Sequence, residues 1–153
     1  MKHKPQKRHI ALQPLSREHH HGLLLSWKIR SGFSKAIAPE RMRVYADWFF
    51  ENHLIPHFEI EETHIFPILD SDHELVKRAL AEHRRLKRLF SESDDDVKTL
   101  SKIEEELEQH IRFEERILFP EIQKAATETQ LKHIENIHQP EHFEDKLDDE
   151  FWR

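Results

Sequence analysis

One stretch of the sequence occurs twice, 53 residues apart. The copies are HFEIEE at 57–62 and HIRFEE at 110–115, and both run on to a Phe-Pro pair, at 66–67 and 119–120. Residues four apart share one face of a helix, so each copy places a histidine beside a glutamate within an apolar frame. Such a pair is unfavourable to bury unless something binds it. Two matching copies therefore indicate more than a solvated helix face.

The composition favours an all-α protein that forms one domain. The chain has 153 residues, which suffices for one full hydrophobic core but not comfortably for two. It has only two glycines and is rich in residues that favour helices. The spacing of apolar residues predicts long helices at about 13–37, 39–66, 72–90 and 97–118. Thr127 or Thr129 is a candidate N-cap of a short fifth helix that runs through Ile137 and ends by Pro140. Short connections between them predict an up-down-up-down antiparallel four-helix bundle.

The chain divides into three parts. Residues 1–11 are expected to be a flexible basic segment, residues 12–126 the bundle, and residues 127–153 a short C-terminal helix and an acidic tail. Ser16 is a candidate N-cap of the first helix, and Ser71 or Asp72 of the third. Pro56 is expected to bend the second helix, with two helices broken at Ile55 as the alternative.

The tail carries three large apolar residues four apart, Phe143, Leu147 and Phe151. This spacing is compatible with an amphipathic helix docked on the bundle. The acidic composition is equally compatible with a disordered tail. Both alternatives stay open on the sequence.

Charge and hydropathy narrow the classes of partner. The chain has 24 Lys and Arg against 30 Asp and Glu, a formal net charge of −6, which gives no reason to expect a nucleic acid or an anionic membrane. No apolar run reaches the ~20 residues of a membrane span, and the basic N-terminus lacks the apolar run of a secretory signal. The expected location is the cytoplasm, and no protein partner is indicated.

The histidines point to a metal site. The chain has no cysteine, so a metal must be held by nitrogen and oxygen, and it has fourteen histidines. Each long helix offers one histidine to the interior, and the second and fourth add a glutamate one turn later. The expected ligands are His19, His57, Glu61, His83, His110 and Glu114. This set suits iron or manganese, and also zinc, and two central carboxylates favour two metal ions bridged by Glu61 and Glu114.

Other residues near this set are expected to have ordinary structural roles, at the rim, in salt bridges or in the core. A lone histidine usually has an ordinary hydrogen-bonding role, but six residues in matching register are hard to explain that way. His53 is expected at the rim, and Glu62 and Glu115 in salt bridges outside the ligands or on solvated faces. His20 directly follows His19 and stays an alternative ligand. The aromatic stripe is more often simply core: Tyr45, Trp48, Phe49 and Phe113.

On these motifs the chain resembles the hemerythrin-like family, whose members carry the His-His-Glu cation-binding domain. The resemblance covers about residues 12–122 and rests on LSREH at 15–19, the stretches 57–67 and 110–120, and AEHRRL at 81–86. It implies a non-haem di-iron site with the four histidines as terminal ligands and the two glutamates as bridges. Lys87 stands where oxygen-carrying members have a further histidine. Glu114 stands four residues after its histidine, where those members have an aspartate at five.

The resemblance implies a protein that binds or senses O2, NO, peroxide or iron at two iron ions, with zinc or manganese as substitutes. Its departures from the oxygen carriers leave at least one iron with fewer protein ligands, which argues against simple reversible oxygen carriage. The alternative is a sensor or interaction module whose order and partner binding depend on metal occupancy. A di-iron redox enzyme ranks third, because the sequence shows no dedicated substrate pocket, second cofactor motif or general base.

Overall fold

A computed structural model of the chain describes residues 7–137 and 143–153. In these residues the secondary structure is helical, without strands, so the predicted all-α class is confirmed for this part of the chain. None of the helices formed by these residues is long and apolar enough to cross a membrane. Pro140, the expected end of the last helix, lies outside the described residues, as do His3, His138 and His142.

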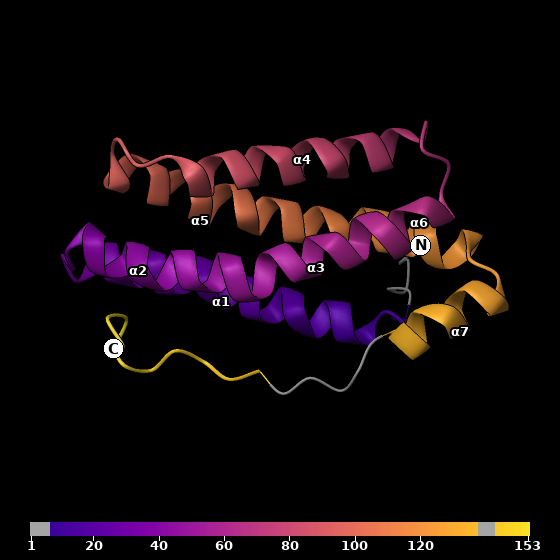
Figure 1. Ribbon diagram of the computed structural model, residues 1–153, viewed down its shortest axis with the longest axis horizontal. Coiled ribbons are helices and arrows are strands. Elements are labelled where there is room, and N and C mark those ends of the chain that lie inside the picture. Colours follow the sequence, from indigo (N-terminus) through magenta and orange to yellow (C-terminus); the bar gives the residue numbers. More distant parts are fainter. Residues whose placement is uncertain (1–6, 138–142) are drawn as a thin grey trace, which may run out of the picture.

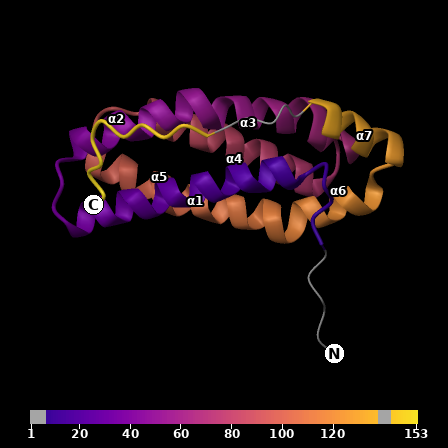
Figure 2. The same ribbon diagram turned by 90° about the horizontal axis from the view of Figure 1, so that it is seen from below.

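Four long helical segments lie side by side along the long axis of the molecule, and both views agree on this (Figures 1 and 2). They are α1, the continuous segment from α2 to α3, α4 and α5, while α6 and α7 lie at one end. The α-helices are α1 (Gln13–Ser34), α2 (Pro39–Phe49), α3 (Ile55–Ile60), α4 (Glu74–Ser91), α5 (Asp96–Phe113), α6 (Phe119–Ala125) and α7 (Glu128–Ile137). The turns between them are η1 (Phe50–Leu54), η2 (Glu61–Ile65), η3 (Phe66–Ile68) and η4 (Glu114–Leu118).

Three prolines shape the helices that carry the repeat. Pro56, Pro67 and Pro120 are each the second residue after a five-residue π-helical turn, η1, η2 and η4 respectively. A proline ring removes one hydrogen bond and presses on the carbonyl four residues earlier, and a wider turn accommodates both effects. The chain therefore stays helical through Pro56, as one helix rather than two broken at Ile55.

The helix starts correct two predictions. Ser16 does not cap α1, which begins earlier, after Leu12; the Ser16 hydroxyl instead donates a hydrogen bond to Glu115 at 3.0 Å. His73, rather than Ser71 or Asp72, caps α4, because its Nδ1 accepts a hydrogen bond from the Leu75 amide. The sequence does not indicate this cap, because serine, threonine, aspartate and asparagine are the residues that usually cap helices.

The apolar core is divided into two clusters with a polar layer between them. One contains Leu25 of α1, Phe49 of α2 and Leu107 of α5, and the other contains Leu15 of α1 and Phe119 of α6. All five side chains are essentially buried, and each contributes about 1.5–3 kcal/mol to folding through burial. In each of the four long segments, the inward histidine lies near the point in the sequence where residues of one cluster are replaced by residues of the other.

The C-terminal segment 143–153 is neither of the alternatives that the sequence left open. It is mostly extended, yet it is docked beside α1 and α2, with Phe151 and Trp152 buried and Leu147 exposed (Figure 2). The buried Lys28 ammonium donates hydrogen bonds to Asp145 and to the Tyr45 hydroxyl, both at 2.7 Å. A buried lysine needs such a partner, and the tail supplies it.

Candidate metal centre

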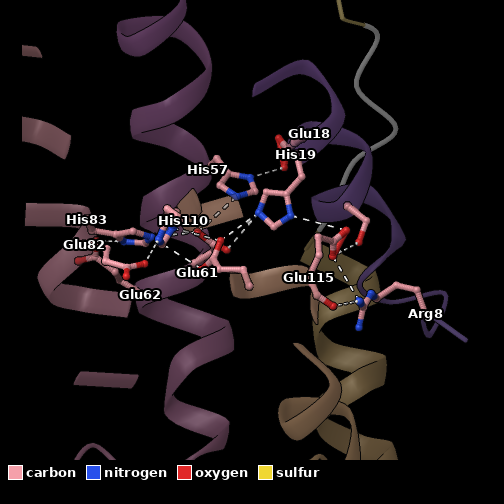
Figure 3. A network of polar contacts seen from close by, with 12 residues as sticks. Arg8, Glu18, His19, His57, Glu61, Glu62, Glu82, His83, His110 and Glu115 are labelled. Atoms are coloured by element: carbon pink, nitrogen blue, oxygen red, sulfur yellow. Dashed lines mark hydrogen bonds and ion pairs between the residues drawn. The ribbon is translucent and has the colours of Figure 1, made fainter. Parts of the chain in front are cut away.

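The polar layer between the two apolar clusters contains all six residues that the sequence nominated. Each helix supplies one histidine, and the first residue of each of two π-helical turns, η2 and η4, supplies a glutamate (Figure 3). None of the six is more than 4% exposed: His19, His57, Glu61, His83, His110 and Glu114. Helical spacing within each repeat and the packing of four segments together produce this burial.

The six residues form two overlapping groups of possible ligands. His19 and His57 belong to one group, His83 and His110 to the other, and Glu61 and Glu114 belong to both. Within each group the ligand atoms lie within 4.8 Å of one another. The histidines are paired in the same way by their rings, with centroids 4.8 Å apart in the first pair and 4.9 Å in the second. The buried clusters can therefore hold a metal ion.

The distances between donor atoms fit a common ion of ordinary size. Two atoms bound to one first-row metal at about 2.1 Å lie about 3.0–3.4 Å apart when the angle at the ion is about 90–110°. The histidine Nε2 atoms lie close to carboxylate oxygens at such distances: His19 to Glu114 at 3.0 Å, His83 to Glu61 at 3.2 Å, His57 to Glu61 at 3.3 Å and His110 to Glu114 at 3.3 Å.

Most of these atoms face each other without forming hydrogen bonds. In the described part of the chain, the buried side-chain atoms without a hydrogen-bond partner include Nε2 of His57, His83 and His110. They also include both oxygens of Glu61 and one of Glu114. Unpaired buried polar atoms are strongly unfavourable, and their convergence on one space is what a cation would relieve. The residues present therefore fit a bound metal.

A ring of outer carboxylates surrounds the four histidines. Each histidine turns Nε2 inward and Nδ1 toward a glutamate on a neighbouring segment (Figure 3). The pairs are His57 with Glu18 at 3.1 Å, His83 with Glu62 at 2.8 Å, His110 with Glu82 at 2.7 Å, and His19 with Glu115 at 3.7 Å. When Nδ1–H donates to the carboxylate, the Nε2 lone pair is left free for a metal.

These outer pairs close a cycle around the molecule. A glutamate of α1 serves the histidine of α3, one of η2 serves α4, one of α4 serves α5, and one of η4 serves α1. The expected outer position of Glu62 and Glu115 is confirmed. Lys87 lies outside the ligands, with its Nζ 3.7 Å from Glu62.

In the chain without a bound cation, the pKa shifts of the ligand residues also show that the site favours positive charge. Burial lowers the pKa of His57 and of His110, but the nearby carboxylates outweigh it and raise both pKa values to about 9. Burial raises the pKa of Glu61, but His57, His19 and His83 outweigh it and hold that pKa well below its ordinary value. The Glu61 carboxylate thus stays ionised, and protonated imidazoles supply the positive charge that a metal would bring.

Sequence reasoning missed two of the outer carboxylates. Glu18 and Glu82 each directly precede a ligand histidine, so a Glu-His pair occurs on both helices that carry only one ligand. That repeated pair is the signal that identifies them. Of the alternatives, His20 is exposed and belongs to neither group, while His53 lies beside Phe49, with ring centroids 5.3 Å apart.

A cavity of about 570 Å³ adjoins the centre. Its lining includes His19, His57, His110 and Glu114, together with apolar side chains of α1, α3 and α5. His83 and Glu61 are not among the lining residues. The two groups of ligands therefore differ in their access to this space.

Comparison with protein-family models, with curated proteins and with solved structures finds no match for this chain. The evidence for function is therefore the residues of the site and their geometry. They establish an all-helical fold with buried His/Glu clusters that can hold a metal ion.

Proposed function

We propose that this chain is a hemerythrin-like protein that holds a non-haem di-iron centre and uses it to bind or sense O2, NO, peroxide or iron. The observation that carries the proposal is the pair of ligand groups that share Glu61 and Glu114. Two histidines for each ion and two shared carboxylates give a symmetric site for two cations, because shared carboxylates reduce the repulsion between them. Zinc and manganese accept the same donors and are possible substitutes.

The finer architecture in this proposal is the up-down-up-down four-helix bundle. Its support is the side-by-side arrangement of the four long segments and the short connections between them, residues 35–38, 69–73 and 92–95 (Figure 1). In such a bundle, consecutive helices run in opposite directions, so ligands at matched levels meet in the centre. The reduced ligand set, with Lys87 directed to Glu62, supports a role other than simple oxygen carriage.

In this function the chain positions its donors and keeps water from most of the site. Hydrogen bonds to outer carboxylates orient the imidazoles of His57, His83 and His110, and the apolar clusters at both ends exclude solvent. When bound, a di-iron pair supplies open coordination positions and redox capacity for a small ligand. A small ligand would reach those positions from the side of the centre that faces the cavity.

Anaerobic titration with ferrous iron tests the proposal. We expect two ions per chain by elemental analysis, and an absorbance spectrum that changes on exposure to air. The double variant His57→Ala/His110→Ala removes one ligand from each group and should abolish stoichiometric binding. Wild-type metal content in this variant, or no stoichiometric uptake by the native chain, would contradict the proposal.

A metal-dependent sensor or interaction module is a second candidate function. One observation favours it: Phe143 of the C-terminal segment stacks on the His21 ring at 3.8 Å and lines the cavity next to the ligands. A change in the packing of α1 around His19 would therefore reach the tail. Limited proteolysis of metal-free and metal-loaded protein tests this, and equal protection of the tail in both forms would count against it.

A further inference from the structure

The cavity beside the centre is an elongated slot between helices. α1 and the segment from the end of α2 to α3 form its sides, α5 contributes Leu107, His110 and Ile111, and η4 contributes Glu114. On α1 the lining residues recur at helical spacing from Pro14 through Glu18 to Gly22. Eight residues of α1 span about 12 Å along a helix axis. The slot is thus long enough for an extended molecule.

The slot has a polar part and an apolar part. The polar part contains the ligands His19, His57 and Glu114, and the exposed Arg17 lies at its rim. The apolar part lies further along the same helices and is lined by residues that include Gly22, Phe49, Leu54, Leu107 and Ile111. A Cβ at Gly22 would lie 2.6 Å from the terminal Cδ1 of Ile111, so a larger residue there would force the Ile111 side chain to move.

The size of the slot exceeds the needs of a diatomic ligand. A water molecule occupies about 30 Å³ in the liquid, whereas sites for small organic molecules measure about 300–1,000 Å³. At about 570 Å³ the slot falls in the second range. A channel for O2 or NO alone would not need an apolar chamber beyond the ligands.

From this arrangement we propose that the slot binds an organic amphiphile with an oxygen-donor head group and an unbranched apolar tail. The head group lies at the His19/His57 side of the centre, and the tail lies along the part of the slot that Phe143 borders. Open positions on a hard metal favour anionic oxygen, and the apolar chamber favours a hydrocarbon chain. This inference rests on the proposed metal centre and adds a class of ligand to it.

The C-terminal segment completes the chamber. Phe143 stacks on His21 and lies 4.7 Å from the His53 ring, so it covers the apolar part between two helices. Asp145, two residues on, anchors the segment to Lys28. A tail in the chamber would therefore contact Phe143 as well as the bundle.

Calorimetric titration of the iron-loaded chain under nitrogen with acetate and with octanoate tests the proposal. Each buried methylene group raises an association constant about fourfold, so we expect octanoate to bind at least about 100-fold more tightly than acetate. Phe143→Ala, which removes the aromatic cover of the chamber, should reduce this ratio several-fold while acetate binding is retained. Leu147→Ala is the matched control, because Leu147 is an exposed apolar residue of the same segment and does not line the slot.

Three outcomes separate this inference from the proposed function. If the chain takes up no iron, the metal centre itself is contradicted. If it takes up two ions but binds acetate and octanoate equally, only the amphiphile site is overturned. Equal octanoate binding by the iron-loaded and the metal-free chain would overturn the position of the head group. Because all three are read from binding and metal content, none depends on a catalytic assay.

Discussion

The two histidine pairs share their carboxylates but differ in their surroundings. His19 and His57 both line the slot, whereas His83 does not and is covered by Phe58, which stacks on it at 3.8 Å. Phe66 approaches His83 from another direction, at 5.3 Å. The first pair thus faces space that a ligand can enter, and the second is closed by aromatic rings, apart from the contact of His110 with the slot.

This difference shows how one donor set can serve two purposes. Equivalent ligands give the two positions similar affinity for a cation, while access decides which position meets an exogenous ligand. We therefore expect the His83/His110 position to hold its ion as a fixed partner and the His19/His57 position to react with ligands. Four experiments test this distinction, in order of decreasing effect.

Removing a shared carboxylate should abolish the difference by emptying both positions. Glu61 belongs to both groups, so we expect Glu61→Ala to lose essentially all bound iron. Glu59→Ala is the control, since Glu59 is an exposed residue of α3 two positions away. Elemental analysis after anaerobic loading provides the measurement, and one retained ion per chain in Glu61→Ala would show that this carboxylate is not shared.

Removing one histidine from each pair should separate the two positions. We expect His57→Ala and His83→Ala each to halve the iron content, because each residue belongs to a single group. Azide binding, followed by absorbance, should be lost in His57→Ala and largely retained in His83→Ala, because only His57 lines the slot. The reverse pattern would place the reactive position at the closed side.

The outer carboxylates allow a finer comparison with a matched pair. Glu18 and Glu62 have the same side-chain exposure, 34%, and each faces Nδ1 of one histidine. Because such partners orient the imidazole, we expect Glu18→Ala and Glu62→Ala to weaken iron binding about 10–100-fold at their own positions. The glutamine variants should restore part of this affinity. Unchanged affinity in both alanine variants would reduce the outer ring to surface salt bridges.

The smallest effect is expected from the tail that covers the open side. Burial raises the pKa of Asp145, but hydrogen bonds from Lys28 and Tyr45 outweigh it and hold the pKa below its ordinary value. The folded pKa is depressed, so the stability that this carboxylate contributes is present above pH ~4 and is lost as the pH falls through the folded pKa.

Asp145→Asn should therefore loosen the tail already at neutral pH and remove this acid transition. Tryptophan fluorescence of the metal-free chain can follow it, because Trp152 lies over the Lys28 ammonium, 3.9 Å from it. The Trp152→Phe variant shows which part of the fluorescence change comes from Trp152. In the loaded chain, azide should bind a few-fold faster in the Asp145→Asn variant. Identical pH profiles of the native and variant chains would show that Asp145 does not hold the tail.

Much of the fold follows from local features of the sequence. Thr127, one of two candidate caps of the last helix, accepts a hydrogen bond from the Gln130 amide, and Asp95 caps α5. The docking of the tail was not predictable, because it depends on the buried Lys28, which is 117 residues from Asp145 in the sequence.

The six ligands were predictable because each is marked by its own helix. The spacing of four between His57 and Glu61 is a local property, and an apolar frame on either side marks the buried face. Glu18 and Glu82 escaped notice, because a glutamate beside a histidine on a helix points about 100° away and its partner lies on another helix. No single-helix pattern contains that partner.

The sequence by itself determined the all-helical class, the donor atoms and the absence of thiolate chemistry, since these depend on composition and on spacing within one helix. Only the tertiary structure decided which histidines form a pair, which glutamate serves which imidazole, and which side of the centre opens to the slot. Those features depend on the rotation and register of segments packed together, and the same repeated motif is compatible with more than one arrangement. The repeat supplied equivalent ligands, and packing made the two positions different.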